Sequence, residues 1–237
     1  MADDELRHNA ILGALPGPEY RRLAPRLELV DAQVREQVYH PGKQITDLYF
    51  PIASVFSMVG LADGQVAVEV ATIGREGMVG LPVFLGQMCS PHAAFCQVSG
   101  AAARMPAAEL APVLADDGAL HGLLSRFTQA TMVQISQNVV CNSTHPLSQR
   151  AARWLLTTHD RVGQDEFPLT QQFLGQMLGA ARPTVSETAG KLQARGLIRY
   201  SRGKMTITDR PGLEKAACSC YATVRAEFDR LTGNRQA

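Results

Sequence analysis

The chain has 237 residues, of which 46% are hydrophobic and 19% are charged, a composition that excludes a mainly disordered protein. The 23 lysines and arginines nearly balance the 22 aspartates and glutamates, which excludes a general nucleic-acid-coating protein but permits a local basic surface. No stretch reaches the roughly 18 apolar residues of a membrane span, and the acidic, polar start is unlike a signal peptide, so we expect a cytoplasmic protein without membrane association.

The first half of the sequence predicts short helices followed by strands. Residues 1–40 indicate short helices that are interrupted by Pro16, Pro18 and Pro25. From Val38 to Met105 the pattern changes to short strands separated by glycine turns, with a hairpin signal at Asp63-Gly64. Many short strands with such turns favour a sandwich or a small barrel.

A long helix is predicted next, capped by Asp116-Asp117 and ending near Asn142. One stripe of this helix suits a seam between two chains, because it mixes apolar residues with polar residues that fix register. A core helix that packs only on its own barrel is an equally weighted alternative. The predicted dimer interface consists of Leu120, Leu124, Phe127, Thr131, Ile135 and Asn138. A further helix begins at Pro146, and Phe167-Pro168 is expected to close it.

The segment 171–190 predicts a helix-turn-helix. Thr170 is a natural N-cap for its first helix, Gly175 is small where the two helices cross, and Gly179 tolerates the turn. Pro183 suits the first turn of the second helix, where a missing N–H costs nothing. An ordinary helical hairpin is the alternative interpretation.

The residues after this motif predict a wing. The second helix is expected to end at Gly196, and two short strands then flank the basic hairpin Ser201–Lys204, whose Arg202 and Lys204 suit contacts with phosphate. Between Gln171 and Lys204 the only acid is Glu187, whereas the basic residues are Arg182, Lys191, Arg195, Arg199, Arg202 and Lys204. The sequence therefore predicts a winged helix-turn-helix that binds duplex DNA.

The stretch from Thr170-Gln171-Gln172 to Leu197-Ile198 resembles the helix-turn-helix of the Crp/Fnr family, and the flanking order of elements is similar as well. The resemblance implies an α+β protein with an N-terminal cyclic-nucleotide-binding-type β-roll at 1–115, a dimerisation helix at 116–144 and the winged helix-turn-helix at 145–237. It also implies a homodimer that binds a palindromic operator and contacts RNA polymerase.

By position in that family, Arg182 matches an arginine that reads guanine. Pro183 and Glu187 depart from the family pattern, so the operator is expected to differ from the usual one, and Ala181 is a poor N-cap. The DNA-binding residues implied in this way, together with the wing, are Thr170, Gln171, Arg182, Pro183, Thr184, Ser186, Glu187, Lys191, Arg202 and Lys204.

The run Gly74–Leu81 resembles the family's phosphate-binding cassette. Met78 stands where the family has the ribose-binding glutamate, and His92 stands where it has the phosphate-binding arginine. We therefore expect a degenerate effector pocket formed by Gly77, Met78, Gly80, Leu81, His92 and Ala93, which does not bind cyclic AMP. Arg75 and Glu76 are expected to form an exposed pair or turn contacts.

We expect no cofactor and no metal. The family's iron–sulfur members use an N-terminal cysteine cluster, whereas the first cysteine here is Cys89. Cys218 and Cys220 are placed in a C-terminal helix, where they would point to opposite sides and lack two further ligands for zinc. Candidate haem ligands (His92, His121 or His145) are each interpreted as ordinary polar residues.

Other functional classes remain as alternatives. One is a regulator gated by an unidentified small-molecule or redox effector, and another is a ligand-binding module with no role at DNA. An enzyme is not expected, because the sequence lacks a nucleophile elbow, a P-loop, a dinucleotide fingerprint and an HExxH motif.

Overall fold

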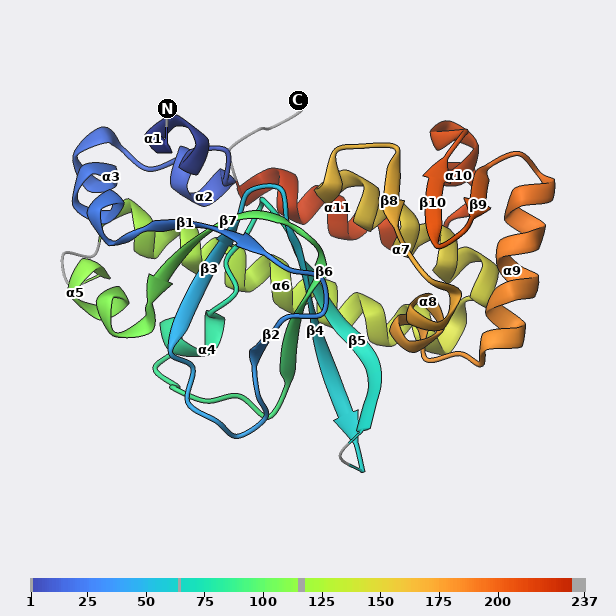
Figure 1. Cartoon of the computed structure of the whole chain (residues 1–237), viewed down its shortest axis with the longest axis horizontal. Helices are drawn as coiled ribbons and strands as arrows, with labels where there is room; N and C mark the ends of the chain where they lie inside the picture. Colours follow the sequence, from blue (N-terminus) through green and yellow to red (C-terminus); the bar gives the residue numbers. More distant parts are fainter. Residues whose placement is uncertain (1, 64, 115–117, 232–237) are drawn as a thin grey trace.

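The computed structural model describes residues 2–63, 65–114 and 118–231. Figure 1 shows an elongated molecule with a β-rich N-terminal half and a smaller C-terminal half. Helix α6 (Ala119–Thr144) runs through the middle and, with 26 residues, is about 39 Å long. None of the described helices combines the length and the apolar character needed to cross a membrane.

Short helices open the chain, as the prolines predicted: α1 (Ala2–Leu6), α2 (Ala10–Gly13), α3 (Gly17–Leu23) and the 3₁₀ helix η1 (Ala24–Arg26). The expectation that helices extend to residue 40 was wrong, because strands β1 (Glu28–Ala32) and β2 (Gln37–Tyr39) already lie within this segment. Strand β1 pairs with the distant β7 (Gly100–Pro106), a pairing that satisfies its backbone groups and leaves no trace in the local sequence pattern.

Two antiparallel sheets form the N-terminal half. Their other strands are β3 (Asp47–Pro51), β4 (Val55–Ala62), β5 (Gln65–Ile73) and β6 (Ala93–Val98). The strand orders are β1-β7-β3 and β2-β6-β4-β5. Ala62 pairs with Gln65, so the predicted two-residue hairpin turn is present, with Asp63 at a φ of 50°; its second residue, Gly64, lies outside the described residues. Short helices complete this half: α4 (Leu81–Phe84), η2 (Ala107–Glu109) and α5 (Leu110–Leu114).

Helix α6 buries the stripe that the sequence assigned to a dimer seam. Its N-cap is Gly118, and the predicted cap, Asp116-Asp117, lies outside the described residues. Leu120, Leu124, Phe127, Thr131 and Asn138 are all buried within their own chain. A Cβ atom at Gly77 would lie 2.2 Å from the Phe127 ring, which shows how closely that ring packs on the N-terminal half.

Five of the six residues predicted for the seam therefore pack within their own chain, as in the alternative interpretation, and their side chains are not accessible to a partner. Dimerisation through α6 stays a prediction. Of the six predicted residues, Ile135 alone is half-buried. The exposed apolar side chains on α6 are Met132 (59%), Val139 (63%) and Val140 (47%).

The C-terminal half begins with α7 (Leu147–Val162), which ends at Gly163 in a left-handed conformation. Phe167-Pro168 does not close this helix, as had been expected, but belongs to strand β8 (Glu166–Pro168). The strand order β8-β10-β9 explains the difference, since β8 completes the sheet of the wing. The remaining elements are α8 (Gln171–Leu178), α9 (Arg182–Ala194), β9 (Ile198–Ser201), β10 (Lys204–Ile207), α10 (Arg210–Ala216) and α11 (Cys220–Leu231).

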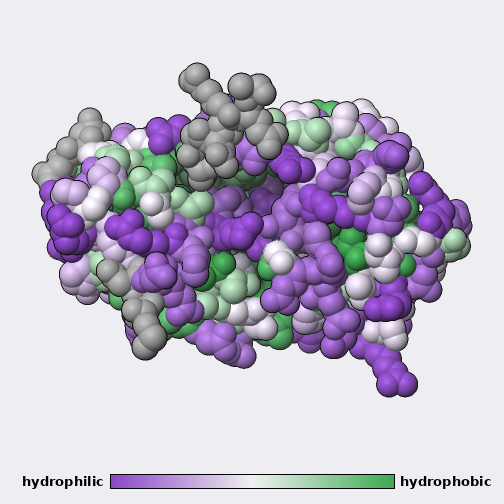
Figure 2. Space-filling view, turned by 90° about the horizontal axis from the view of Figure 1, so that it is seen from above, coloured by the Kyte–Doolittle hydropathy of each residue, from purple (hydrophilic) through white to green (hydrophobic). Residues whose placement is uncertain are grey.

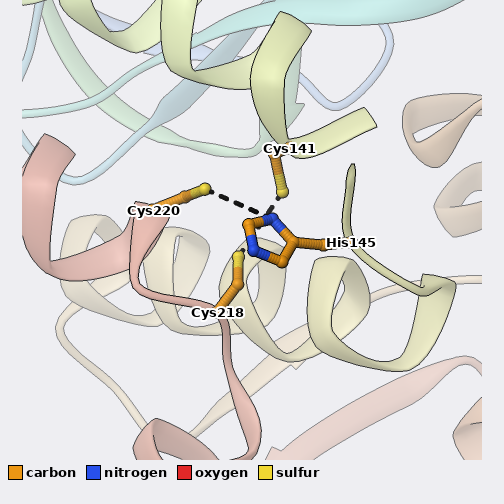
Figure 3. Close-up of side chains that lie close together, drawn as sticks. All are labelled: Cys141, His145, Cys218 and Cys220. Carbon is orange, nitrogen blue, oxygen red and sulfur yellow. Dashed lines mark hydrogen bonds between the residues drawn. The ribbon is translucent and has the colours of Figure 1, made fainter. Parts of the chain in front are cut away.

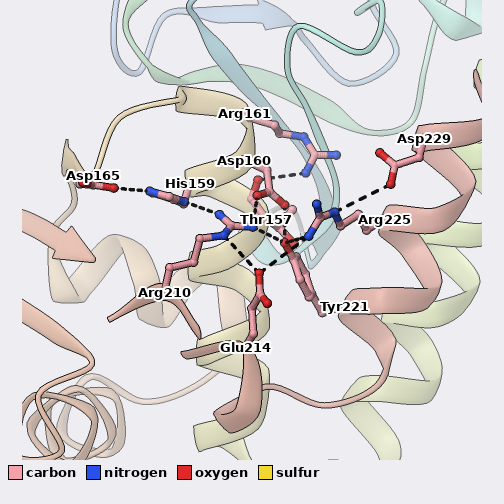
Figure 4. Close-up of polar contacts among 10 residues, drawn as sticks. All are labelled: Thr157, His159, Asp160, Arg161, Asp165, Arg210, Glu214, Tyr221, Arg225 and Asp229. Carbon is pink, nitrogen blue, oxygen red and sulfur yellow. Dashed lines mark hydrogen bonds and ion pairs between the residues drawn. The ribbon is translucent and has the colours of Figure 1, made fainter. Parts of the chain in front are cut away.

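Helix α11 returns to the N-terminal half. Leu231 joins the core of that half, and the Phe228 ring lies 6.3 Å from the Phe127 ring. Figure 4 shows the polar network that holds α11 to α7 and α10. Arg210 donates hydrogen bonds to Asp160 (2.6 Å) and to the Tyr221 hydroxyl (2.7 Å), and that hydroxyl donates to Asp160 (2.7 Å). Burial, with the nearby carboxylate, raises the pKa of Tyr221 to about 12.

Candidate nucleic-acid interface

The first part of the interface is the helix pair α8 and α9. The Thr170 hydroxyl caps α8 by accepting a hydrogen bond from the Phe173 amide (3.1 Å). Gly179 ends α8 at a φ of 59°, and a Cβ atom at Gly175 would lie 2.8 Å from the Ala180 carbonyl oxygen. The structure thus shows each of the three local roles that the sequence predicted.

Helix α9 has one buried face and one exposed face. Val185, Ala189 and Leu192 are buried against the rest of the C-terminal half. The opposite face exposes the predicted contact residues Arg182, Pro183, Thr184, Glu187 and Lys191. This division is what a recognition helix requires, because only exposed side chains can reach base edges in the major groove.

Charge on the exposed face of α9 is partly paired. Glu187 forms an ion pair with Lys191 (2.7 Å), and both side chains are exposed. Arg182 has no ion-pair partner within the described parts of the chain. Ala181 precedes it without a capping hydrogen bond, as expected. The guanidinium at the start of α9 is therefore available to a ligand.

Two predicted contact residues bind each other. The Ser186 hydroxyl donates to the Gln171 side-chain oxygen and so links α9 to the start of α8. The Gln171 amide in turn donates to the Tyr200 hydroxyl of the wing (3.2 Å). These hydrogen bonds fix α8, α9 and the wing relative to one another. That Gln171 and Ser186 also contact DNA stays a prediction.

The wing is a tight hairpin whose turn residues, Arg202 and Gly203, have φ values of 50° and 77°. Lys204 forms an exposed ion pair with Glu166 (2.8 Å), whereas Arg202 has no ion-pair partner among the residues that the structure covers. Arg202 and Arg182 line the same surface hollow, together with Thr170, Gln171 and Tyr200. Figure 2 shows hydrophilic side chains over much of this end of the molecule.

Some of the residues expected to form a degenerate effector pocket are packed against the core. Met78 is fully buried, and its neighbour Gly77 lies against the Phe127 ring. His92 is half-buried. Glu76 makes the expected turn contact with the Gly74 amide (3.0 Å).

Glu76 also forms an ion pair with Arg161 of α7 (2.8 Å), a contact that the sequence did not predict. It is part of a wider association between the two halves of the chain. Phe173 of α8 packs edge-on against Phe95 of the N-terminal sheet, with ring centroids 5.9 Å apart. The nearby Trp154 indole donates to the buried Glu69 carboxylate (2.8 Å). The N-terminal half therefore contacts the half that holds the helix-turn-helix directly.

The interpretation of Cys218 and Cys220 was wrong. Helix α11 begins at Cys220, so Cys218 precedes it, and the two side chains are not held on opposite sides of a helix. Both lie beside Cys141 and His145, which supply the two further ligand atoms that the sequence interpretation had declared absent.

Comparison with known proteins agrees with this geometry. Residues 149–216 match the Crp-like helix-turn-helix domain. No protein of curated function matches the sequence. Among solved structures, the fold resembles a putative Crp/Fnr-family transcriptional regulator from Eubacterium rectale ATCC 33656, with a TM-score of 0.67 and 16% identity over 87% of this chain and 96% of that chain.

Two further solved structures are similar. A CRP-family transcriptional regulator from Thermus thermophilus has a TM-score of 0.63 and 18% identity over 79% of this chain and 96% of that one. The c-di-GMP-responsive global regulator CLP of Xanthomonas campestris has a TM-score of 0.62 and 16% identity over 81% of this chain and 99% of that one. At these identities the likeness shows the fold.

The matched domain defines the class of the C-terminal half: residues 149–216 form a Crp-like helix-turn-helix domain, a DNA-binding fold. Over most of its length the chain also has the fold of solved structures described as Crp/Fnr-family transcriptional regulators.

Proposed function

We propose that the protein binds a palindromic DNA operator as a homodimer and does so without cyclic AMP. The observation that carries this proposal is the shared hollow at which α9 presents Arg182 and the wing presents Arg202. An arginine at the start of a recognition helix suits a bidentate contact with guanine, and a wing arginine suits phosphate. In this proposal Arg182 provides sequence specificity, and Arg202 positions the protein on the DNA backbone.

The operator is expected to differ from that of other family members. Pro183 cannot accept a hydrogen bond from cytosine, and Glu187 is already paired with Lys191. Base reading therefore falls mainly on Arg182, with Thr184 and Ser186 beside it.

The second copy of the chain is expected to pack along the exposed face of α6. Met132 and Val139 are seven residues apart and so lie on one side of the helix, while Val140 lies next to them. Burying these side chains between two copies removes apolar surface from water. A two-fold axis along α6 would also present two α9 helices to successive half-sites. RNA polymerase is the expected further partner.

Independence from cyclic AMP follows from the cassette. Met78 and His92 occupy the positions of the two charged contacts that orient a cyclic nucleotide in the family. The Phe127 ring packs directly against Gly77 of the same segment. An anionic phosphate in such a site would lack a fixed cation and would be desolvated without compensation.

Binding-site selection from genomic fragments, followed by titration of the selected operator, tests this proposal. Arg182→Ala should cost about 1–3 kcal/mol on the operator and relax preference at one base pair in each half-site. Arg202→Ala should weaken binding equally on all sequences and reduce the salt slope by about one. Lys204→Ala should have a smaller effect, because Lys204 already pairs with Glu166.

The matched control is Arg104→Ala, since Arg104 lies on the N-terminal sheet and pairs with Glu28. This variant should bind the operator like the wild type. Unchanged operator affinity in Arg182→Ala would show that α9 does not read DNA in this way.

A further inference from the structure

Four potential metal ligands converge where the two halves of the molecule meet. Cys141 lies in the last turn of α6, and His145 lies between α6 and α7. Cys218 lies between α10 and α11, and Cys220 begins α11. Figure 3 shows their side chains pointing toward one another from these two separate junctions.

The spacing of the four ligand atoms fits one small ion. All four atoms lie within 4.8 Å of one another. The Cys141 and Cys218 sulfurs are 3.5 Å apart, and the Cys220 sulfur is 3.5 Å from His145 Nδ1. In a tetrahedral zinc site, Zn–S bonds of about 2.3 Å place two sulfurs about 3.8 Å apart. The two 3.5 Å separations are within a few tenths of an ångström of this geometry, and the widest separation in the cluster exceeds it by at most about 1 Å.

We infer that Cys141, His145, Cys218 and Cys220 bind a single Zn²⁺ ion in a tetrahedral site. Three thiolates and one imidazole are a common ligand set of closed, structural zinc sites. Thiolates are soft ligands that Mg²⁺ and Ca²⁺ avoid. An iron–sulfur cluster distributes its cysteine ligands over several iron atoms, so it does not suit four ligand atoms gathered around one point.

The surroundings of the four residues support a buried, anionic metal site. The three cysteines are buried, at 0%, 6% and 1% exposure for Cys141, Cys218 and Cys220. The Gln137 side-chain amide donates to the Cys220 sulfur (3.1 Å), and such an outer hydrogen bond would orient and stabilise a metal-bound thiolate.

Two arginines, Arg150 and Arg153, would balance the negative charge of the metal site. Zn²⁺ with three thiolates carries a net charge of −1, and the positive charges of Arg150 and Arg153 act on Cys141. The Nε atoms of both arginines are buried and have no hydrogen-bond partner in the described structure. Arg153 is buried and Arg150 is half-buried, and desolvating a cation is costly, so a neighbouring anionic centre would stabilise both.

The ion would join two junctions of the chain. On one side it would hold the link between α6 and α7, where the long helix passes into the DNA-binding half. On the other side it would hold the start of α11, which returns to the core of the N-terminal half. Zinc would therefore stabilise the position of the DNA-binding half relative to α6, and its removal would lower the melting temperature.

The test is the zinc content of the full chain purified under reducing conditions, measured by elemental mass spectrometry. One zinc per chain is expected, and cobalt(II) in its place should give the absorption of a tetrahedral thiolate complex. Cys218→Ser and His145→Ala should lose the ion on dialysis against a chelator. His145→Cys should keep it, since four cysteines also form a zinc site. Cys89→Ser is the matched control, because Cys89 is exposed and outside the cluster.

Three results would overturn the inference: reduced protein that takes up no zinc, zinc that His145→Ala retains as tightly as the wild type, and a Cys141–Cys218 disulfide in protein kept under reductant. Should Cys218→Ser fail to fold, His145→Ala decides the matter, because His145 is only half-buried and its loss should leave the fold intact. Circular dichroism checks the folding of each variant, and the melting temperature of the wild type with and without chelator measures the stabilisation by the ion.

Discussion

Two aspartate substitutions on α6 should have opposite effects, because one residue faces solvent and the other faces the core. Val139 is 63% exposed in the single chain, whereas Phe127 is completely buried. We expect Val139→Asp to give a folded monomer with greatly weakened operator binding. Phe127→Asp should instead destabilise the N-terminal half itself.

The expected losses of dimer stability and of folding stability can be worked out from the burial of the two side chains. Full burial of a valine contributes about 1.5–3 kcal/mol, so the exposed 63% of Val139 corresponds to about 1–2 kcal/mol in each chain. A symmetric seam loses this twice, about 2–4 kcal/mol, which weakens the dimer by roughly 30-fold to 1,000-fold. At Phe127, loss of the ring alone costs about 3–5 kcal/mol, and a buried carboxylate adds to it. Total domain stabilities are only about 5–15 kcal/mol.

Sedimentation velocity over a concentration series, with thermal unfolding by circular dichroism, separates the two effects. Val34→Asp is the control, since Val34 is an exposed valine (51%) that lies between β1 and β2 and outside α6, and the change should leave the dimer unchanged. A Val139→Asp protein that dimerises like the wild type would refute the proposed interface. A Phe127→Asp protein with wild-type melting behaviour would contradict the packing of α6.

The remaining predictions concern the effector and a buried acid. Isothermal calorimetry should detect no binding of cyclic AMP or cyclic GMP at micromolar concentration. Two charged hydrogen bonds are lost, each worth about 1.5–3 kcal/mol, and their loss weakens affinity by roughly two to four decades. Tight binding, or operator binding that occurs only with nucleotide, would show that the protein does respond to a cyclic nucleotide. Burial raises the pKa of Glu69 above its ordinary 4.5, so its contribution to stability should fall as pH rises from the unfolded-state value through the folded one. Glu69→Gln keeps an acceptor for the Trp154 indole and a donor for the Ser57 hydroxyl. In denaturant titrations between pH 5 and pH 8, the unfolding free energy of this variant should therefore decline less with pH than that of the wild type. A variant that is destabilised equally at every pH would argue against a role of Glu69 ionisation.

The helix-turn-helix was predictable because each of its requirements is met by residues close in the sequence. Thr170 caps the helix that follows it, and Gly179 takes the positive φ of its own turn. Gly175 is small because Ala180 passes over it. The wing is similar, since Arg202 and Gly203 form the turn between two adjacent strands. Local chemistry decides such motifs, and distant contacts hardly alter them.

The role of the long helix was not predictable in the same way. An amphipathic stripe shows which side of a helix avoids water but not what covers it. Here Phe127 packs against Gly77 and lies close to Phe228, both remote in sequence. Glu69 is another such case, since a carboxylate on a valine-rich strand would be expected in solvent. It is buried because Ser57 and Trp154 donate to it.

The cysteine and histidine cluster shows most clearly what spacing rules omit. The Cys218-Ser219-Cys220 segment, taken alone, supplies only two ligands. If both cysteines lay within a helix, their side chains would point to opposite sides, and only one of them could reach a given metal ion. Helix α11 in fact begins at Cys220, which leaves Cys218 free to turn toward Cys141, 77 residues earlier in the chain. A signal was present in the sequence, because Cys141 and His145 are four residues apart, a spacing that brings two side chains to one face at the end of a helix. Each pair is incomplete alone, and only the return of α11 along α6 makes them a single candidate site.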